Sequence, residues 1–178
     1  MDRVLIASYW AEAAHGAIGQ TRGSGDNVEK YVEHCRRVAH HVHRVIPKDT
    51  DAICAALLHD VLEDTKTTAA DLLQHFNERT VDLVMEVTDP KHPEGLRRAE
   101  RVQINRNKLS LASPAGKIIK LCDVYDNTEF IRRDMPKFAP LYIQEKILLM
   151  AFLRGAHDAL WEQVNERVMS EARIMGVV

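Results

Sequence analysis

The chain has 178 residues and a net charge of −2, and 46% of its residues are hydrophobic against 28% charged. This length allows one domain with a sizeable core, and the small negative charge disfavours broad electrostatic binding of nucleic acid. No apolar run approaches the roughly 18 residues of a membrane-spanning helix, and the first residues do not resemble a secretory signal. The sequence therefore predicts a cytoplasmic protein that does not cross a membrane.

Apolar residues recur at helical spacing along nearly the whole chain. The pattern predicts helices over residues 4–18, 28–45, 52–62, 69–76, 80–87, 96–111 and 115–130, and two more between residues 139 and 175. No alternating pattern indicates a β-strand. We expect an all-α, multi-helix fold in a single domain of residues 1–178.

Turn and capping residues mark the ends of several predicted helices. Asp49 and Asp51 can cap the helix of residues 52–62, and Ser113 with Pro114 begins the helix of residues 115–130. Polar segments at residues 16–27 and 89–95 are predicted loops, and loops on a helical scaffold commonly carry ligand contacts. The three cysteines show no CxxC spacing, so we expect small buried side chains rather than disulfides or a zinc site.

Four polar side chains interrupt apolar helical segments. His59 and Asp60 follow the apolar residues 55–58, His34 lies on an apolar stripe, and Asp123 follows a largely apolar run. A lone histidine such as His34 is more often an ordinary core or surface residue than a ligand, but a buried carboxylate needs a partner or a metal. Two imidazoles and two carboxylates would suit Mn²⁺, Fe²⁺, Co²⁺ or Zn²⁺ better than Ca²⁺. The set therefore indicates a site for a divalent metal.

Two acidic residues follow this pair at helical spacing. Glu63 comes four residues after His59, and Asp64 comes four residues after Asp60. On a helix this spacing places each acid on the face of its predecessor, one turn onward. From there a carboxylate can orient a water molecule or accept its proton. The alternative is that both acids are solvated residues at a helix end.

The ordered set His34, His59–Asp60 and Asp123 resembles the H…HD…D signature of HD-domain metal-dependent phosphohydrolases. The surrounding sequence resembles the (p)ppGpp hydrolase domain of RelA/SpoT proteins and the stand-alone small alarmone hydrolases, including those of the metazoan SpoT homologue type. The similar stretches are residues 19–22, 31–34, 55–65, 83–89 and 117–127. The motif-bearing core thus covers about residues 14–130, and helices of about residues 138–175 carry no specific motif.

The resemblance implies a function as well as a fold. It implies that His34, His59, Asp60 and Asp123 ligate one divalent metal, usually Mn²⁺, with the acidic pair beside it. The implied reaction removes the 3′-pyrophosphate of ppGpp or pppGpp and gives GDP or GTP plus pyrophosphate. The alternatives are a phosphatase acting on another nucleotide, such as a nucleoside phosphate or the 2′-phosphate of NADPH, and a non-catalytic nucleotide sensor.

A polyphosphate substrate also needs cationic and polar contacts. Arg22 corresponds to the arginine of the family's QxRK motif, and we expect it to bind substrate. Arg101 belongs to a second basic cluster, and Asn127 matches the family's asparagine after the last ligand. The alternative role of Asn127 is a hydrogen bond within its own helix.

The sequence departs from the family pattern around substrate recognition. Gly23 replaces the lysine that usually follows the arginine, Cys35 replaces the proline after the first histidine, and Val124 replaces a basic residue.

Apolar residues near the C-terminal end could build core or the face of a homodimer, and core is the favoured interpretation. The C-terminal apolar stripe consists of Leu160, Val164, Val168 and Ile174, and the same two alternatives apply to Trp10 and Trp161.

Overall fold

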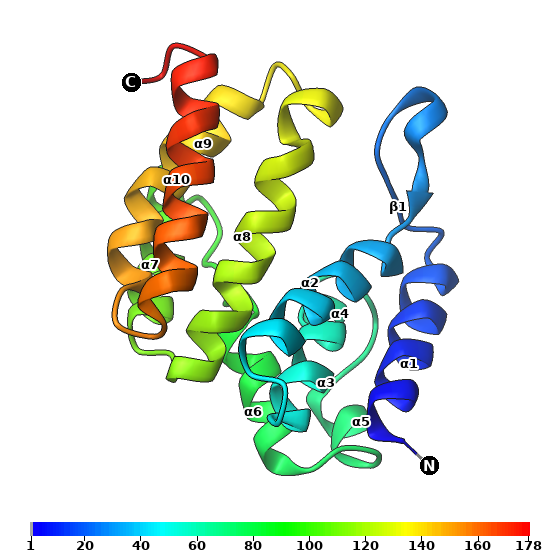
Figure 1. Cartoon of the computed structure of the whole chain (residues 1–178). Helices are drawn as coiled ribbons and strands as arrows, with labels where there is room; N and C mark the ends of the chain where they lie inside the picture. Colours follow the sequence, from blue (N-terminus) through cyan, green and yellow to red (C-terminus); the bar gives the residue numbers. More distant parts are fainter. Residues whose placement is uncertain (1) are drawn as a thin grey trace. The chain divides into compact units, whose positions relative to one another are not determined.

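The computed structural model describes residues 2–178 of the chain (Figure 1). These residues form two compact units, one ending at Thr88 and the other running from Asp89 to Val178. Apart from one small hairpin, both units are helical, as the sequence predicts. The expected single domain of residues 1–178 stays a prediction.

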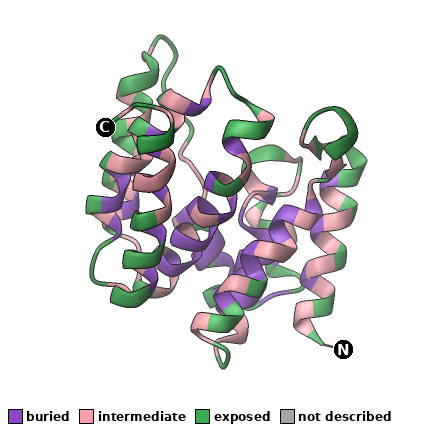
Figure 2. Ribbon diagram, turned by 45° about the horizontal axis from the view of Figure 1, so that its top comes forward, coloured by how far each residue is buried: buried purple, intermediate pink, exposed green. Residues whose placement is uncertain are grey.

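The first unit is built around the apolar helix α3 (Thr50–Leu58). Residues 52–58 of this helix are all buried, and α3 packs against α1 (Arg3–Ala17), α2 (Val32–Val45) and α6 (Glu78–Val87). The face of α1 that is buried carries alanines at positions 7 and 11, whose small side chains allow two helices to approach closely. Short helices α4 (Val61–Asp64) and α5 (Ala69–Leu73) complete the unit. Buried residues are purple in Figure 2.

The segment between α1 and α2 differs from two predictions, which are the helix from residue 28 and the lack of β-strands. Residues 28–30 were expected to begin a helix, but β1 (Thr21–Arg22) and β2 (Glu29–Lys30) form a small antiparallel hairpin, joined by the 3-10 turn η1 (Gly25–Asn27). Gly23 begins the turn with φ +93°, and a Cβ atom there would lie 2.2 Å from the carbonyl oxygen of Asn27. Strands of two residues are too short to give an alternating pattern, so periodicity alone did not reveal them.

The helix expected over residues 52–62 is divided at the His-Asp pair. His59 is the C-cap of α3 and Asp60 is the N-cap of α4. Asp49 caps the start of α3 as predicted, because its side chain accepts a hydrogen bond from the amide of Ala52 at 3.1 Å. The break places His59 and Asp60 at a junction between helices rather than inside one.

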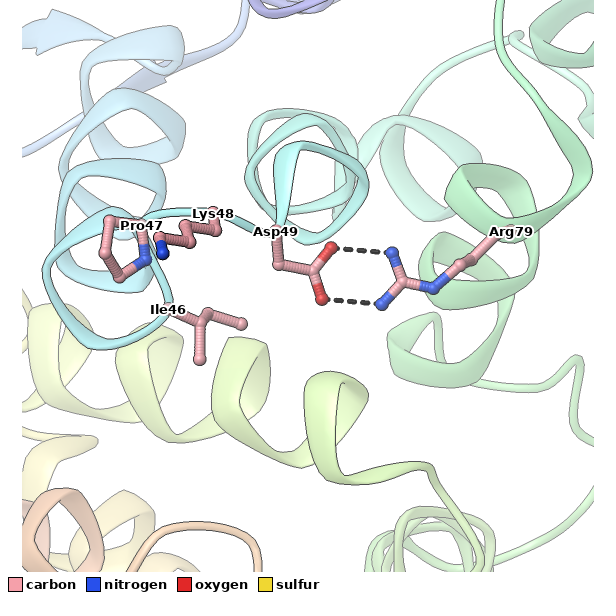
Figure 3. Close-up of a pocket in the computed structure, with 5 residues that line it drawn as sticks. All are labelled: Ile46, Pro47, Lys48, Asp49 and Arg79. Atoms are coloured by element: carbon pink, nitrogen blue, oxygen red, sulfur yellow. Dashed lines mark hydrogen bonds and ion pairs between the residues drawn. The ribbon is translucent and has the colours of Figure 1, made fainter.

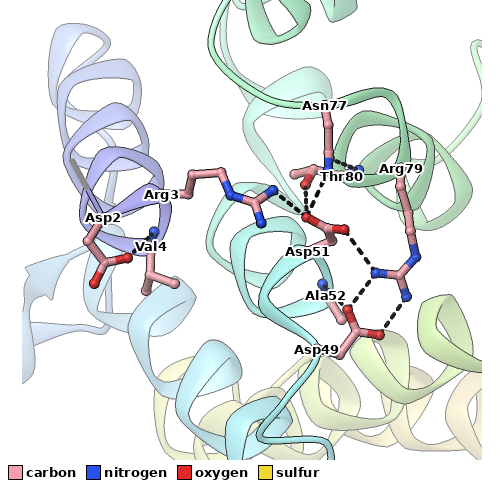
Figure 4. Close-up of polar contacts among 9 residues, drawn as sticks. All are labelled: Asp2, Arg3, Val4, Asp49, Asp51, Ala52, Asn77, Arg79 and Thr80. Atoms are coloured by element: carbon pink, nitrogen blue, oxygen red, sulfur yellow. Dashed lines mark hydrogen bonds and ion pairs between the residues drawn. The ribbon is translucent and has the colours of Figure 1, made fainter.

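Ion pairs join the N-terminal ends of three helices in this unit (Figure 4). Arg79 of α6 contacts Asp49 at 2.5 Å and Asp51 at 3.1 Å, while Arg3 of α1 reaches Asp51 at 2.6 Å. Asn77, the N-cap of α6, also donates to Asp51 at 3.1 Å. Carboxylates near helix N-termini interact favourably with the helix dipole as well as with these cations.

The second unit consists of α7 (Arg98–Ser110), α8 (Pro114–Asp134), α9 (Ala139–Met150), the 3-10 turn η2 (Ala151–Leu153) and α10 (Asp158–Ile174). Ser113 caps α8, with Pro114 in the first turn, as the sequence predicts. The long helix α8 packs against α9 and α10. The core interpretation is confirmed for Leu160, Val164 and Val168, which are buried, whereas Ile174 is 59% exposed.

Two other expectations concern the cysteines and membrane-spanning helices. All three cysteines are buried and free of disulfides, as expected from their apolar settings. Among residues 2–178, no helix is both long enough and apolar enough to cross a membrane.

Candidate metal and catalytic site

Three of the four predicted metal ligands come together in the first unit. His34 lies in the first turn of α2, and His59 and Asp60 lie at the junction of α3 and α4. Nε2 of His59 is 3.0 Å, and Nε2 of His34 is 3.7 Å, from Oδ2 of Asp60. One potential ligand atom from each residue lies within 4.8 Å of the others. Both histidines are buried, at 0% and 2% exposure.

The protonation of His59 follows from its backbone contact. Nδ1 of His59 lies 2.8 Å from the carbonyl oxygen of Ala56, which can only accept a hydrogen bond, so Nδ1 carries the proton. In the neutral imidazole, Nε2 then presents its lone pair toward the Asp60 carboxylate. Two acceptors at 3.0 Å repel each other unless a cation or a proton lies between them.

Tyr31 holds the carboxylate of this cluster. Its hydroxyl donates to Oδ2 of Asp60 at 2.6 Å, and its ring packs edge-on against His34. Burial, together with the charge of Asp60, raises the pKa of Tyr31, so the phenol remains a donor. The sequence places Tyr31 in a stretch that resembles the family, directly before α2, but nothing in that stretch distinguishes a buried hydroxyl with a partner from a packing residue.

The donor set of this cluster fits a divalent metal. Two imidazole nitrogens and a carboxylate oxygen are ligands that first-row divalent ions accept. The outward hydrogen bonds of His59 to a carbonyl and of Asp60 to a phenol are the kind that orient metal ligands. Among the residues that the structure describes, this is the group of histidine and acidic side chains close enough to hold an ion.

Asp64 lies one helical turn beyond Asp60. Its amide donates to the carbonyl oxygen of Asp60 at 2.9 Å, and its exposed side chain accepts a hydrogen bond from Nε2 of Gln20 at 2.8 Å. Glu63, its neighbour, is also exposed. The two acids therefore follow the cluster on α4, within the first unit.

Asp123 belongs to the second unit. It is 5% exposed on α8, where Nζ of Lys120 lies 2.7 Å from one carboxylate oxygen and the side chain of Asn127 donates to the other. The local contact that the sequence left open for Asn127 is thus present. The roles of Asp123 as fourth ligand and of Asn127 as substrate contact stay predictions.

The two arginines predicted to bind substrate lie in different settings. Arg22 is half-buried in β1 of the first unit. Arg101, on α7 of the second unit, is exposed and donates to the carbonyl oxygen of Leu96 at 2.9 Å. That contact supports the loop before α7, and both binding roles stay predictions.

A pocket of about 510 Å³ lies in another part of the first unit (Figure 3). It is lined by Ile46, Pro47, Lys48, Asp49 and Arg79. The guanidinium of Arg79 is held by both carboxylate oxygens of Asp49, so it is committed to the structural ion pairs at the helix ends. The pocket contains none of the predicted site residues, and we assign it no function.

The sequence matches the HD domain family over residues 7–146, a range that includes His34, His59, Asp60 and Asp123. The chain belongs to this family. The match confirms the HD-domain resemblance drawn from the four residues. It agrees with the helical structure and with the triad of possible ligands in the first unit.

This HD-domain protein is similar to several characterised proteins. It is 32% identical to guanosine-3′,5′-bis(diphosphate) 3′-pyrophosphohydrolase MESH1 of Xenopus tropicalis over 174 residues, which cover 94% of each chain. Human MESH1 is 35% identical over 136 residues, covering 76% of this chain and 73% of the human protein. The solved structure of a metazoan ortholog of SpoT that hydrolyses ppGpp has a TM-score of 0.81 and 25% identity, covering 100% of this chain and 98% of that one. The predicted all-α HD-domain fold is thereby confirmed.

The sequence assigns no role to two polar residues, one in each unit. His15 is 1% exposed at the end of the alanine face of α1, where a polar residue on a buried stripe is a usable signal. Lys146 lies on α9 in the second unit, and burial together with the neighbouring charge of Lys120 lowers its pKa to about 8. Its helix carries no family motif, so no sequence signal marked this lysine.

Proposed function

We propose that this HD-domain protein is a metal-dependent pyrophosphohydrolase that converts ppGpp or pppGpp to GDP or GTP and pyrophosphate. The observation that carries the proposal is the His34–His59–Asp60 triad, with its hydrogen bonds to Ala56 and Tyr31. Similarity to MESH1 over 94% of both chains supports the substrate, because the relative is named for this reaction.

His34, His59 and Asp60 hold the metal in this proposal, with Asp123 as the fourth ligand and Mn²⁺ as the ion. A bound divalent metal would act as a Lewis acid toward water and toward the phosphoryl oxygens of the substrate. Burial of the two imidazoles and the hydrogen bond from the Tyr31 hydroxyl to Asp60 orient these three donor groups in the first unit.

In this proposal, an acidic residue of α4 accepts the proton that the attacking water molecule loses. The oxygen of a water molecule bonds to the phosphorus next to the ribose 3′ oxygen, and the bond between that phosphorus and the 3′ oxygen breaks. Glu63 or Asp64 accepts the proton that leaves the water, and the ribose oxygen gains a proton to become a hydroxyl. Their exposure on α4, one turn beyond the pair of possible ligands, suits groups that meet an incoming substrate.

Arg22, Arg101 and Asn127 bind the nucleotide in this proposal. A guanidinium offers paired donors to phosphate oxygens and a planar face to a base. Gly23 and Val124 replace basic residues of the family pattern, so fewer cations surround the substrate here than in that pattern. The predicted cytoplasmic location belongs to the same proposal, and the homodimer is the alternative that the sequence left open beside a monomer.

The deciding experiment is chromatographic analysis of ppGpp incubated with the purified protein and Mn²⁺. We expect GDP and pyrophosphate, and no product with EDTA or with Asp60→Ala. Asp82→Ala, which changes an exposed aspartate of α6, is the matched control and should retain activity. Turnover of a nucleoside phosphate or NADPH without turnover of ppGpp would contradict the substrate assignment. Light scattering of the same preparation tests the homodimer.

A further inference from the structure

Hydrogen bonds connect His15, a buried histidine outside the predicted ligand set, to Asp64, one of the two proposed catalytic acids. His15 is 1% exposed on α1, and its ring centroid lies 4.7 Å from that of Tyr31. Nδ1 of His15 is 2.7 Å from Oε1 of Gln20, and Nε2 of Gln20 is 2.8 Å from Oδ2 of Asp64. On its other side, Nε2 of His15 lies 3.9 Å from Sγ of Cys35. These contacts form a chain that ends on Asp64.

The chemistry of the groups sets the direction of each hydrogen bond. An ionised carboxylate only accepts, so the amide nitrogen of Gln20 faces Asp64 and its amide oxygen faces His15. That oxygen also only accepts, so Nδ1 of His15 carries the proton. Nε2 of a neutral His15 is then an acceptor, and it faces the weak S–H donor of Cys35. Every bond in the chain therefore donates toward Asp64.

Backbone contacts hold the central residue of the chain. The amide of Gln20 donates to the carbonyl oxygen of His15 at 3.0 Å, and its own carbonyl oxygen accepts from the amide of Tyr31 at 3.4 Å. The backbone of Gln20 is thus tied to the end of α1 and to the residue before α2, while its side chain is tied at both polar atoms. A glutamine fixed in this way has little freedom to change its orientation.

We propose that Gln20 is a positioning residue, oriented by His15, that fixes the Asp64 carboxylate in the orientation in which it accepts a proton from water. The hydrogen bond holds Oδ2 of Asp64, and in this proposal Oδ1 is the oxygen that receives the proton. This inference rests on the proposed function, because Asp64 is one of the two proton acceptors proposed there. Cys35, which replaces the family's proline, is the buried start of the same chain.

Two substitutions of Gln20 separate positioning from packing. Gln20→Glu keeps an acceptor for His15 but replaces the donor to Asp64 with a repelling carboxylate, whereas Gln20→Met removes both hydrogen bonds. We expect kcat to fall about 10- to 100-fold in both variants, because a misplaced Asp64 carboxylate slows the chemical step. We expect KM to stay unchanged, because Gln20 has no role in substrate binding in this proposal. Gln74→Glu makes the same change of charge at an exposed position of the first unit and should leave kcat unchanged.

A second pair tests whether His15 orients Gln20. The amide nitrogen of His15→Asn can replace Nδ1 as a donor, whereas His15→Leu has no donor. We expect His15→Asn to restore much of the kcat that His15→Leu loses, with equal Mn²⁺ content in all variants. Equal losses in the two variants, or a Gln20→Glu protein with wild-type kcat, would overturn the proposal.

A measurement without substrate separates this proposal from the proposed function. Crystal structures of the wild-type and Gln20→Glu proteins report the orientation of the Asp64 carboxylate directly. We expect that carboxylate to rotate away from residue 20 in the variant, and an unchanged orientation would overturn the positioning role. A wild-type protein that turns over none of the nucleotides tested would contradict the proposed function instead.

Discussion

Nε2 of His59 lies 3.0 Å from Oδ2 of Asp60, the residue that follows it in the chain. Because Nδ1 of His59 donates to the carbonyl oxygen of Ala56, the neutral ring directs a lone pair at this carboxylate. A proton or a cation between the two atoms makes such a pair favourable, and a divalent ion is a cation that this donor set fits. The local hydrogen bonds of this pair therefore favour a metal-bound state.

Metal binding should consequently stabilise the fold. At a free Mn²⁺ concentration about 100 times the Kd, we expect about 2.7 kcal/mol of added stability, which corresponds to a rise in Tm of several degrees. Differential scanning calorimetry with Mn²⁺ and with EDTA measures this difference. Asp60→Asn should abolish it, and Asp82→Asn, at an exposed position of the same unit, should preserve it. Identical Tm values for the wild type under both conditions would contradict the metal site.

Tyr31→Phe tests the support of the Asp60 carboxylate. The substitution removes the 2.6 Å hydrogen bond to Oδ2 of Asp60 but keeps the ring that packs against His15 and His34. Partners of metal ligands typically contribute 10- to 100-fold in affinity, so we expect Mn²⁺ binding to weaken by about that factor. Isothermal titration with Mn²⁺ measures the change, and Tyr9→Phe, which alters an exposed tyrosine of α1, is the control. Equal affinities of the Tyr31→Phe and wild-type proteins would contradict this role.

The sequence predicted the parts of the site that depend on helical spacing. Asp49 caps the start of α3 as predicted, and Asp64 follows Asp60 by one turn of α4, but the helix expected to reach residue 62 ends at Leu58. The contacts of His15 and Tyr31 were not predictable in the same way. Both depend on how α1 and α2 pack against each other, and helical periodicity says which face is buried but not which buried atoms meet.

The hairpin shows why a departure from the family pattern need not be a loss of function. The family's lysine cannot occupy position 23 in this structure, because φ is +93° and a Cβ atom would lie 2.2 Å from a backbone oxygen. The glycine lies in the turn between β1 and β2, and β1 begins directly after Gln20. The sequence shows the replacement, whereas the backbone conformation that excludes a side chain here is visible only in the structure.

Gly23→Lys should accordingly disrupt the hairpin instead of restoring a substrate contact. A side chain at this φ, together with the clash at Asn27, costs about 1–3 kcal/mol locally. We expect faster hydrogen exchange at the amide of Tyr31, which donates to Gln20, and no gain in activity. Gly16→Lys is the matched control, because Gly16 lies in α1 and a Cβ atom there would meet no other atom within 4 Å. Wild-type amide protection in Gly23→Lys would refute the strain argument.

Arg79→Met should lower stability in a pH-dependent way. The hydrogen bonds from Arg79 hold the pKa of Asp49 below its ordinary value, and for Asp51 hydrogen bonds from Arg79, Asn77 and Arg3 outweigh the opposing effect of burial. Because Arg79 is about half-exposed, we discount the ion pairs for solvent screening and expect a loss of about 1–2 kcal/mol near neutral pH.

The sign of the pH dependence follows from the lowered pKa values of these two aspartates. Between the folded and unfolded pKa values the unfolded chain binds more protons, so the contribution of Arg79 is complete above about pH 4 and is lost as the pH falls through the folded values. Urea unfolding at about pH 7, 5 and 3.5 should therefore show the free-energy difference between wild type and Arg79→Met shrinking only at the acidic end. Arg44→Met, at an exposed position of α2, should change the stability little at any pH. A difference for Arg79→Met that is constant across this range would show that Arg79 stabilises the helix ends by packing rather than by its charge.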